Sequence, residues 1–225
     1  MKFILFFIFS LFFFSNTLYS QINLNENFIS KEKLGLHVGT FTNEIQYKKK
    51  INNHFIASLA FGYSNYTLIA DVNLNNNNSV IKLNTDIRSF KSNLEYIPSN
   101  FLNLTFFSGL SYFSKFDLKA DVFLKDNIKF GDIDLRPDVA GNIFSTIVYS
   151  GFSPFAGLSH HTLIGERLSF ESKLTFNYFS NPNVLEYGGT NIFNYNYQNQ
   201  YQFQDLINQF KVLPSLNFGL NYLIK

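Results

Sequence analysis

The sequence contains no cysteine and no tryptophan. The absence of cysteine excludes disulfides, thiolate metal sites and a lipid anchor on an N-terminal cysteine. After residue 20, no segment has the run of about 18 apolar residues that a membrane-spanning helix requires. A chain of this composition that crosses a bilayer must therefore cross it with alternating strands, whose hydropathy signal is weak in each segment.

Charge of either sign is also in short supply. The chain carries 18 Lys and Arg against 16 Asp and Glu, a formal net charge of +2. This near-balance gives no reason to expect a nucleic acid as partner. The sequence has no phosphate-binding loop, no zinc-ligand spacing and no nucleophile elbow. We therefore expect neither a cofactor nor an enzyme.

Aromatic residues are abundant, at 19% of the chain, with 29 Phe and 13 Tyr. Near the N-terminus, Lys2 is followed by an almost unbroken apolar run from Phe3 to Phe14. The run is too short for a membrane helix and is typical of a secretory signal peptide. We predict a signal peptide over residues 1–20, cleaved after Ser20, and one barrel domain over residues 21–225.

The most informative stretch is the last one, Val212–Ile224. Its even positions are apolar, whereas its odd positions from Ser215 to Asn221 are small or polar. Successive side chains of a strand point to opposite faces, so this pattern predicts a strand with one apolar face. Its length fits a tilted transmembrane strand, which needs about 9–11 residues.

Similar alternation predicts further strands. In the first of them the apolar residues move from even to odd sequence positions at residues 39–43. This change of parity indicates a turn or a bulge, and it supplies the one extra strand that an even number of strands requires. A second change of parity before Leu94 indicates another bulge. Residues 139–149 are apolar without clean alternation, so they form either a spanning strand or the rim of one. The remaining predicted strands lie around residues 55–63, 81–96, 102–112, 154–163 and 168–179.

Short and long connections alternate along the chain. Short turns are predicted at 48–53, 97–100 and 164–167, and long polar loops at 73–79, 116–138 and 180–209. Outer-membrane barrels show this asymmetry, with short periplasmic turns and longer outer loops. The apolar residues Phe203, Leu206, Ile207 and Phe210 have helical spacing and predict a short amphipathic helix. The predicted fold is all-β: an antiparallel transmembrane β-barrel of about eight strands, ten if residues 139–149 span, with a short helix before the last strand.

Four segments, residues 109–113, 154–158, 167–184 and 213–222, resemble small outer-membrane β-barrel proteins of Gram-negative bacteria, the OmpW/OmpA-like porin class. The resemblance covers most of residues 21–225 and implies outer-membrane lipid and the barrel-assembly machinery as partners. Such chains usually finish on an aromatic residue that the assembly machinery reads. This sequence ends Leu223-Ile224-Lys225 instead, and Tyr222 is the substitute.

Candidate site residues fall into three groups. Asp86, Arg88, Glu171 and Lys173 lie on strand faces opposite apolar ones, which predicts that they point into the lumen, as an ion-pair network or as the lining of a conduit. The tyrosines of the 180–202 loop and its flank offer a binding surface for sugar or protein: Tyr187, Tyr195, Tyr197 and Tyr201. His160-His161 is the one paired histidine, and adjacent strand residues face opposite ways, so the pair is a poor metal site.

The leading hypothesis is a non-enzymatic outer-membrane barrel, structural or a narrow solute pore, with its ligand unspecified. The alternatives are a surface recognition or adhesion module acting through residues 180–202, and a lipid-modifying barrel enzyme that pairs His161 or His160 with Ser159. A soluble lipocalin-like barrel is the alternative fold, and it would turn the apolar faces of its strands inward. Aromatic residues near the predicted strand ends are interpreted as interfacial girdles.

Overall fold

The computed structural model describes residues 32–74, 77–98, 103–130, 133–164, 166–180, 182–191 and 197–224. The predicted signal peptide, residues 1–20, lies outside them. Within these ranges, no helix has the length and apolar character needed to span a membrane.

Eight antiparallel strands form a closed ring. Pairing between β5 and β9 closes it, so every strand of the ring has a neighbour on both sides. The predicted barrel of eight strands is confirmed, including the extra strand near the N-terminus that the parity change at residues 39–43 supplied. The strands are β1 (Lys33–Gly39), β2 (Asn43–Lys50), β3 (Phe55–Leu74), β4 (Asn77–Tyr96), β5 (Leu104–Leu124), β9 (Gly151–Leu163), β10 (Leu168–Tyr178) and β12 (Val212–Leu223).

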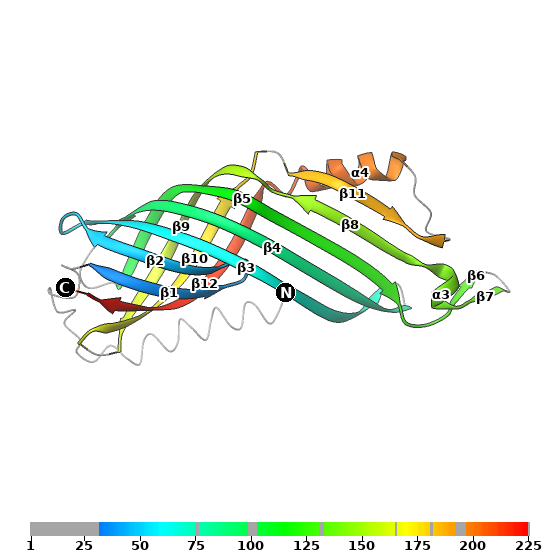
Figure 1. The fold of residues 1–225 in the computed structure, drawn as a ribbon, viewed down its shortest axis with the longest axis horizontal. Coiled ribbons are helices and arrows are strands. Elements are labelled where there is room, and N and C mark those ends of the chain that lie inside the picture. The colour runs from blue at the N-terminus through cyan, green and yellow to red at the C-terminus, as the bar shows by residue number, and fades with distance from the viewer. Residues whose placement is uncertain are drawn as a thin grey trace.

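One side of the barrel continues beyond its rim as an open sheet, which we call the wing (Figure 1). The wing consists of the outer parts of β3, β4 and β5, extended by β8 (Asn142–Val148) and β11 (Asn183–Gly189). Both β8 and β9 pair antiparallel with β5, one above the other, so they act as a single strand interrupted at residues 149–150. The ambiguous segment 139–149 therefore contains a strand, β8, that does not join the ring.

The prediction of a loop at residues 73–79 is wrong, because these residues belong to the wing. The ladder between β3 and β4 runs unbroken to Leu74 and Asn77, so the Asn-rich stretch is mostly strand. Continuous pairing on both sides of β4 outweighs the low strand propensity of asparagine. The predicted loop over 116–138 is wrong for the same reason, because β5 continues to Leu124 with β4 and β8 as neighbours.

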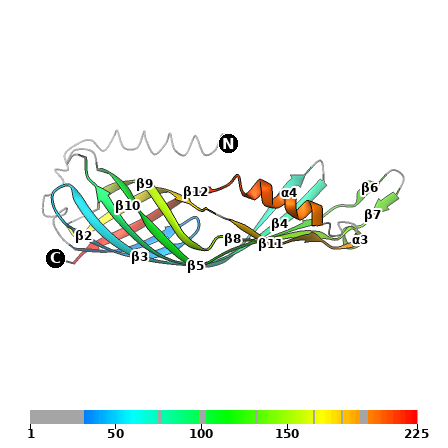
Figure 2. The same cartoon turned by 90° about the horizontal axis from the view of Figure 1, so that it is seen from above.

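The remaining elements lie at the outer end of the molecule. They are β6 (Ile128–Phe130), β7 (Ile133–Leu135), α3 (Pro137–Ala140) and α4 (Tyr197–Ile207). The predicted helix before β12 is α4, which begins and ends earlier than its apolar spacing indicated; the Phe210 amide bonds the Ile207 carbonyl in a turn after the helix. Figure 2 shows α4 lying against one face of the wing beside β11.

Helix α4 covers part of the free edge of β11. The Gln204 side chain accepts a hydrogen bond from the Val184 amide at 2.7 Å and donates one to the Pro182 carbonyl at 2.9 Å. The Phe203 ring stacks on Tyr187 with centroids 4.6 Å apart. An unpaired strand edge is prone to pair with another chain, and side-chain amides here take the place of a neighbouring strand.

Apolar side chains face outward around the ring. Phe176, Leu216 and Leu220 are 44%, 41% and 49% exposed, whereas the residues that alternate with them are buried and polar. A lipocalin-like barrel would show the reverse arrangement. Exposed tyrosines stand on the same outer surface at the two ends of the barrel, Tyr63 and Tyr112 at the level where β2 and β9 begin, as expected for girdles: Tyr63, Tyr96, Tyr112, Tyr178 and Tyr222.

The change of parity in β4 has a different cause from the predicted bulge. The odd positions of β4 face inward throughout, and its register with β3 is unbroken. Its apolar residues change face because the inner side is apolar in the wing, around Ile87, and polar in the barrel, around Glu95. The bulge is in β5, where Arg88 pairs with Lys115 and Ser89 with Phe113, leaving Ser114 as the extra residue.

Candidate functional site

Many charged side chains point into the lumen of the barrel. Glu171 and Lys173 lie on the inner face of β10 and are buried. Other strands of the ring contribute charges that the sequence analysis did not single out. The additional buried charged residues are Lys33, Glu44, Lys48, Lys91 and Glu95. Because charges buried without partners are costly, the arrangement of these groups decides what the lumen can do.

Lys48 lies at the centre of this network. Its ammonium group donates hydrogen bonds to the carboxylates of Glu95, at 2.9 Å, and Glu171, at 2.7 Å. All three side chains are almost completely removed from solvent. The Asn221 amide donates a further bond to Glu171 at 2.8 Å, and Asn93 donates one to Glu95 at 3.2 Å. One lysine thus links β2 to β4 and β10 across the lumen.

A second ion pair lies nearer the outer end. The Lys91 ammonium is 2.6 Å from the Glu44 carboxylate, which also accepts bonds from Thr42 at 2.8 Å and Asn217 at 3.0 Å. Lys173 lies between the two clusters, donating to Gln46 and standing 3.5 Å from Glu171. Together these contacts form a cross-linked column of side chains. This arrangement agrees with the predicted ion-pair network and not with the lining of an open conduit.

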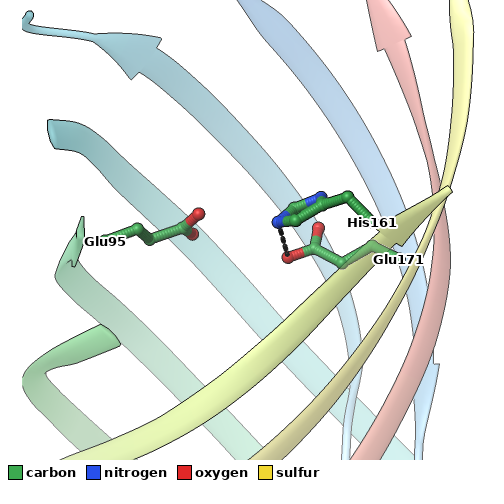
Figure 3. Close-up of side chains that lie close together, drawn as sticks. All are labelled: Glu95, His161 and Glu171. Carbon is green, nitrogen blue, oxygen red and sulfur yellow. Dashed lines mark ion pairs between the residues drawn. The ribbon is translucent and has the colours of Figure 1, made fainter. Parts of the chain in front are cut away.

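Glu95, His161 and Glu171 come close enough to suggest a metal site (Figure 3). One ligand atom from each lies within 4.8 Å of the others, and the His161 Nε2 atom is 3.5 Å from Glu171. However, the Lys48 ammonium group already bridges the two carboxylates. A divalent cation placed between them would meet a buried positive charge. We therefore regard this cluster as a lysine-bridged ion network and not as a metal centre.

Ser159 and His161 also lie on the inner face. The Ser159 hydroxyl is 3.1 Å from His161 Nε2, the same nitrogen that faces Glu171, while His161 Nδ1 has no partner among the described residues. A nucleophile relay needs its acid and its serine on opposite ring nitrogens. Both side chains also face the lumen and not the lipid. The geometry gives no support to a lipid-modifying site.

Asp86 and Arg88 do not join the lumen network, contrary to the prediction. They alternate with Ile87 and Ser89, which are fully buried, and therefore lie on the outer surface. There Asp86 pairs with Lys115 at 2.5 Å. The prediction failed because it took the apolar residues around Ile87 to face lipid, whereas these residues line the inner side of the wing and the barrel mouth.

A cluster of apolar side chains closes the outer mouth of the barrel, and we call it the aromatic plug. Its buried members are Ile87, Phe113, Phe116, Tyr149 and Phe179, with Phe41, Leu118, Ile147 and Leu213 packed against them. Ring centroids within it lie 4.9–5.8 Å apart. Burial in this cluster raises the pKa of Tyr149.

Two neighbouring parts of the sheet break their regularity at this level, and each break supplies side chains to the plug. Phe113 and Phe116 are three residues apart and would face opposite sides of a regular strand, but the bulge at Ser114 turns both inward. Tyr149 occupies the interruption between β8 and β9, and its amide bonds the Phe116 carbonyl at 2.9 Å. Phe179 directly follows β10 and continues the inward alternation of Thr175 and Asn177, and its amide donates to the Lys211 carbonyl at 2.8 Å.

The tyrosines predicted as a contact surface are not equivalent. Tyr187 is occupied by its stacking with Phe203. Tyr201 is 73% exposed on α4. Tyr195 lies outside the described residues, as does the side chain of Tyr197.

The chain was compared with known proteins. No family model matches it, and no curated protein of similar sequence was found. Among solved structures it is similar to CarO of Acinetobacter baumannii, with a TM-score of 0.66 and 16% identity over 90% of this chain and all of that one. It is also similar to CarO2 of the same organism, with a TM-score of 0.66 and 13% identity over 86% of this chain and 98% of that one.

The chain has the fold of the small outer-membrane β-barrels. At this level of identity the likeness concerns the fold alone. The lumen network and the aromatic plug rest on this chain's own residues. Sequence reasoning identified Glu171 and Lys173 but missed Lys48, the main partner of Glu171, which it had placed in a turn. An alternation count started from Ile45 would have put Lys48 on the polar face of β2 with Glu44 and Gln46.

Proposed function

We propose that this protein is a non-enzymatic barrel of the bacterial outer membrane whose lumen is closed to solutes. The outward apolar surface and its tyrosine girdles support a place in lipid, reached through a cleaved signal peptide and the barrel-assembly machinery. The observation that carries the closed state is the aromatic plug, which lies directly above a lumen cross-linked by buried ion pairs.

Two barriers act in series in this proposal. The plug excludes ions because its rings offer no compensation for lost hydration. Below it, the Lys48 and Lys91 pairs join strands that are not neighbours in the ring and leave little space in a ring of eight strands, which is just wide enough for side chains to fill. The structural half of the leading hypothesis is thus favoured over the pore.

Planar-bilayer recordings on the refolded protein test this proposal. We expect no conductance above that of the bare bilayer. A variant with Phe116→Ala and Phe179→Ala removes the centre of the plug. Adding Lys48→Ala, Glu171→Ala, Lys91→Ala and Glu44→Ala to it removes both ion pairs of the second barrier, so only the combined variant should conduct. Phe61→Ala with Phe90→Ala is the control, because these rings pack together 5.1 Å apart on the outer surface. Steady conductance by the unchanged protein would overturn the proposal.

A second candidate function is recognition at the cell surface by the wing and α4. It is favoured by the exposed ring of Tyr201, held on a helix that is fixed to β11 by Gln204. Binding of the purified protein to a printed glycan array is the test, with Tyr201→Ala as the variant and Gln202→Ala, on the same helix, as the control. Equal signals from the protein and its Tyr201→Ala variant would remove this candidate.

A further inference from the structure

Small polar side chains surround the lumen at the level directly beneath the aromatic plug. We call them the hydroxyl ring, and they come from seven of the eight strands or their immediate ends. All of them are buried. The members are Thr42, Ser64, Ser89, Ser111, Ser153, Asn177 and Ser215.

The strand registers bring these residues to a common level. Ser111 pairs directly with Ser153, and Ser89 pairs with Phe113, the next inward residue above Ser111. Across the barrel, Ser215 pairs with Thr175, the next inward residue below Asn177. Since strands in a barrel are tilted and staggered, small offsets of this kind follow a line perpendicular to the barrel axis.

Four polar atoms of the ring have no hydrogen-bond partner in the part of the chain that the structure describes. They are the hydroxyl oxygens of Ser89, Ser111 and Ser215, and the Asn177 Oδ1 atom. Buried polar groups in proteins are almost always paired with protein atoms or with a bound molecule. Four such atoms at one level, contributed by four different strands, indicate that something else supplies their partners.

The dimensions of the barrel agree with this. An eight-stranded ring is filled by side chains or holds one small ligand. Serine reaches only one heavy atom beyond its Cβ, so a level built mainly from serine leaves its centre to another group. The aromatic plug bounds this level above, and the Lys91–Glu44 pair and the buried Phe155 ring bound it below.

We propose that the hydroxyl ring binds a small uncharged guest that presents hydroxyl groups. Hydroxyl and amide groups both donate and accept hydrogen bonds, so the ring can pair with the O–H groups of a guest whether these donate or accept. A charged guest is disfavoured, because the ring carries no charge and Lys91 and Glu44 neutralise each other. Ordered water and a polyol of glycerol size are two sources of this chemistry. The proposal does not depend on whether the barrel conducts.

Crystal structures of the refolded protein, grown with and without glycerol, distinguish these sources. Glycerol bonded to ring atoms in the first crystal identifies a polyol site, and water bonded to them in both crystals identifies a water site. Either result supports the proposal. Ring hydroxyls that bond only to one another or to the protein backbone, with no guest between them, would overturn it.

Thermal unfolding gives an independent readout. Ser89→Ala with Ser111→Ala removes two contacts to the guest, so we expect the midpoint temperature of unfolding to fall. The midpoint is the temperature at which half of the protein has lost the compact form seen by electrophoresis. The matched control is Ser92→Ala with Ser108→Ala, exposed serines of the same two strands, which should leave the midpoint in place. In a ring without a guest, removing unpaired hydroxyls relieves a cost. An unchanged or higher midpoint for the ring variant would therefore contradict the proposal.

Discussion

Replacing Lys48 by methionine tests whether the lumen network stabilises the barrel. Methionine keeps much of the side-chain volume but removes the ammonium group that bridges Glu95 and Glu171. Both carboxylates are fully buried, so the change leaves negative charge without its main partner. Breaking a buried ion pair on one side typically costs about 3–5 kcal/mol. We expect a loss of unfolding free energy of that order.

The structure also predicts which of the two carboxylates accounts for most of the lost unfolding free energy. In the Lys48→Met variant, Glu171 retains Asn221 at 2.8 Å and Lys173 at 3.5 Å. Glu95 retains only the Asn93 amide among the described residues. Adding Glu95→Gln should therefore restore more stability than adding Glu171→Gln, because it neutralises the carboxylate that is left with fewer partners.

Urea unfolding in lipid vesicles, followed by circular dichroism and by the mobility of unboiled samples, measures these differences. Lys49→Met is the matched control, because Lys49 is 63% exposed and pairs with Glu32 at the surface. Surface ion pairs contribute little to stability, so this variant should unfold at the same urea concentration as the unchanged protein. The reasoning fails if Lys48→Met is no less stable than Lys49→Met, or if Glu171→Gln proves the better rescue.

Three further results are expected. Zinc should not raise the unfolding midpoint of the unchanged protein but should raise that of Lys48→Met, because the lysine no longer occupies the cluster of Glu95, His161 and Glu171. Equal effects of zinc on both proteins would contradict the interpretation of this cluster as a lysine-bridged ion network. Gln204→Leu should speed hydrogen exchange at the Val184 amide, whereas Gln202→Leu on the exposed side of α4 should not. His161→Ala should leave the outer-membrane lipids unaltered in mass spectra, and a change in lipid A or phospholipid acylation would revive the enzyme hypothesis.

Local alternation was sufficient wherever a strand keeps one environment on each face. The segments around Phe176 and Leu216 run only through the barrel, so their apolar positions identified the outer surface and their polar positions the interior. The same pattern placed Glu171 and Lys173 on the inner face of β10. It misled in β4, where the inner side is apolar in the wing and polar in the barrel, and Asp86 and Arg88 were therefore assigned to the wrong face.

The class of fold could be predicted from the residues alone, because a period of two residues is a local property that does not depend on neighbouring strands. The continuation of the strands as a wing, the bridging of two carboxylates by Lys48 and the closing of the mouth by aromatic rings became evident in the folded chain alone. Each of these depends on register between strands far apart in the chain, and a shift of one residue would reverse every side chain. The bulge at Ser114 shows this most clearly: its effect on Phe113 and Phe116 exists only in the pairing of β5 with β4.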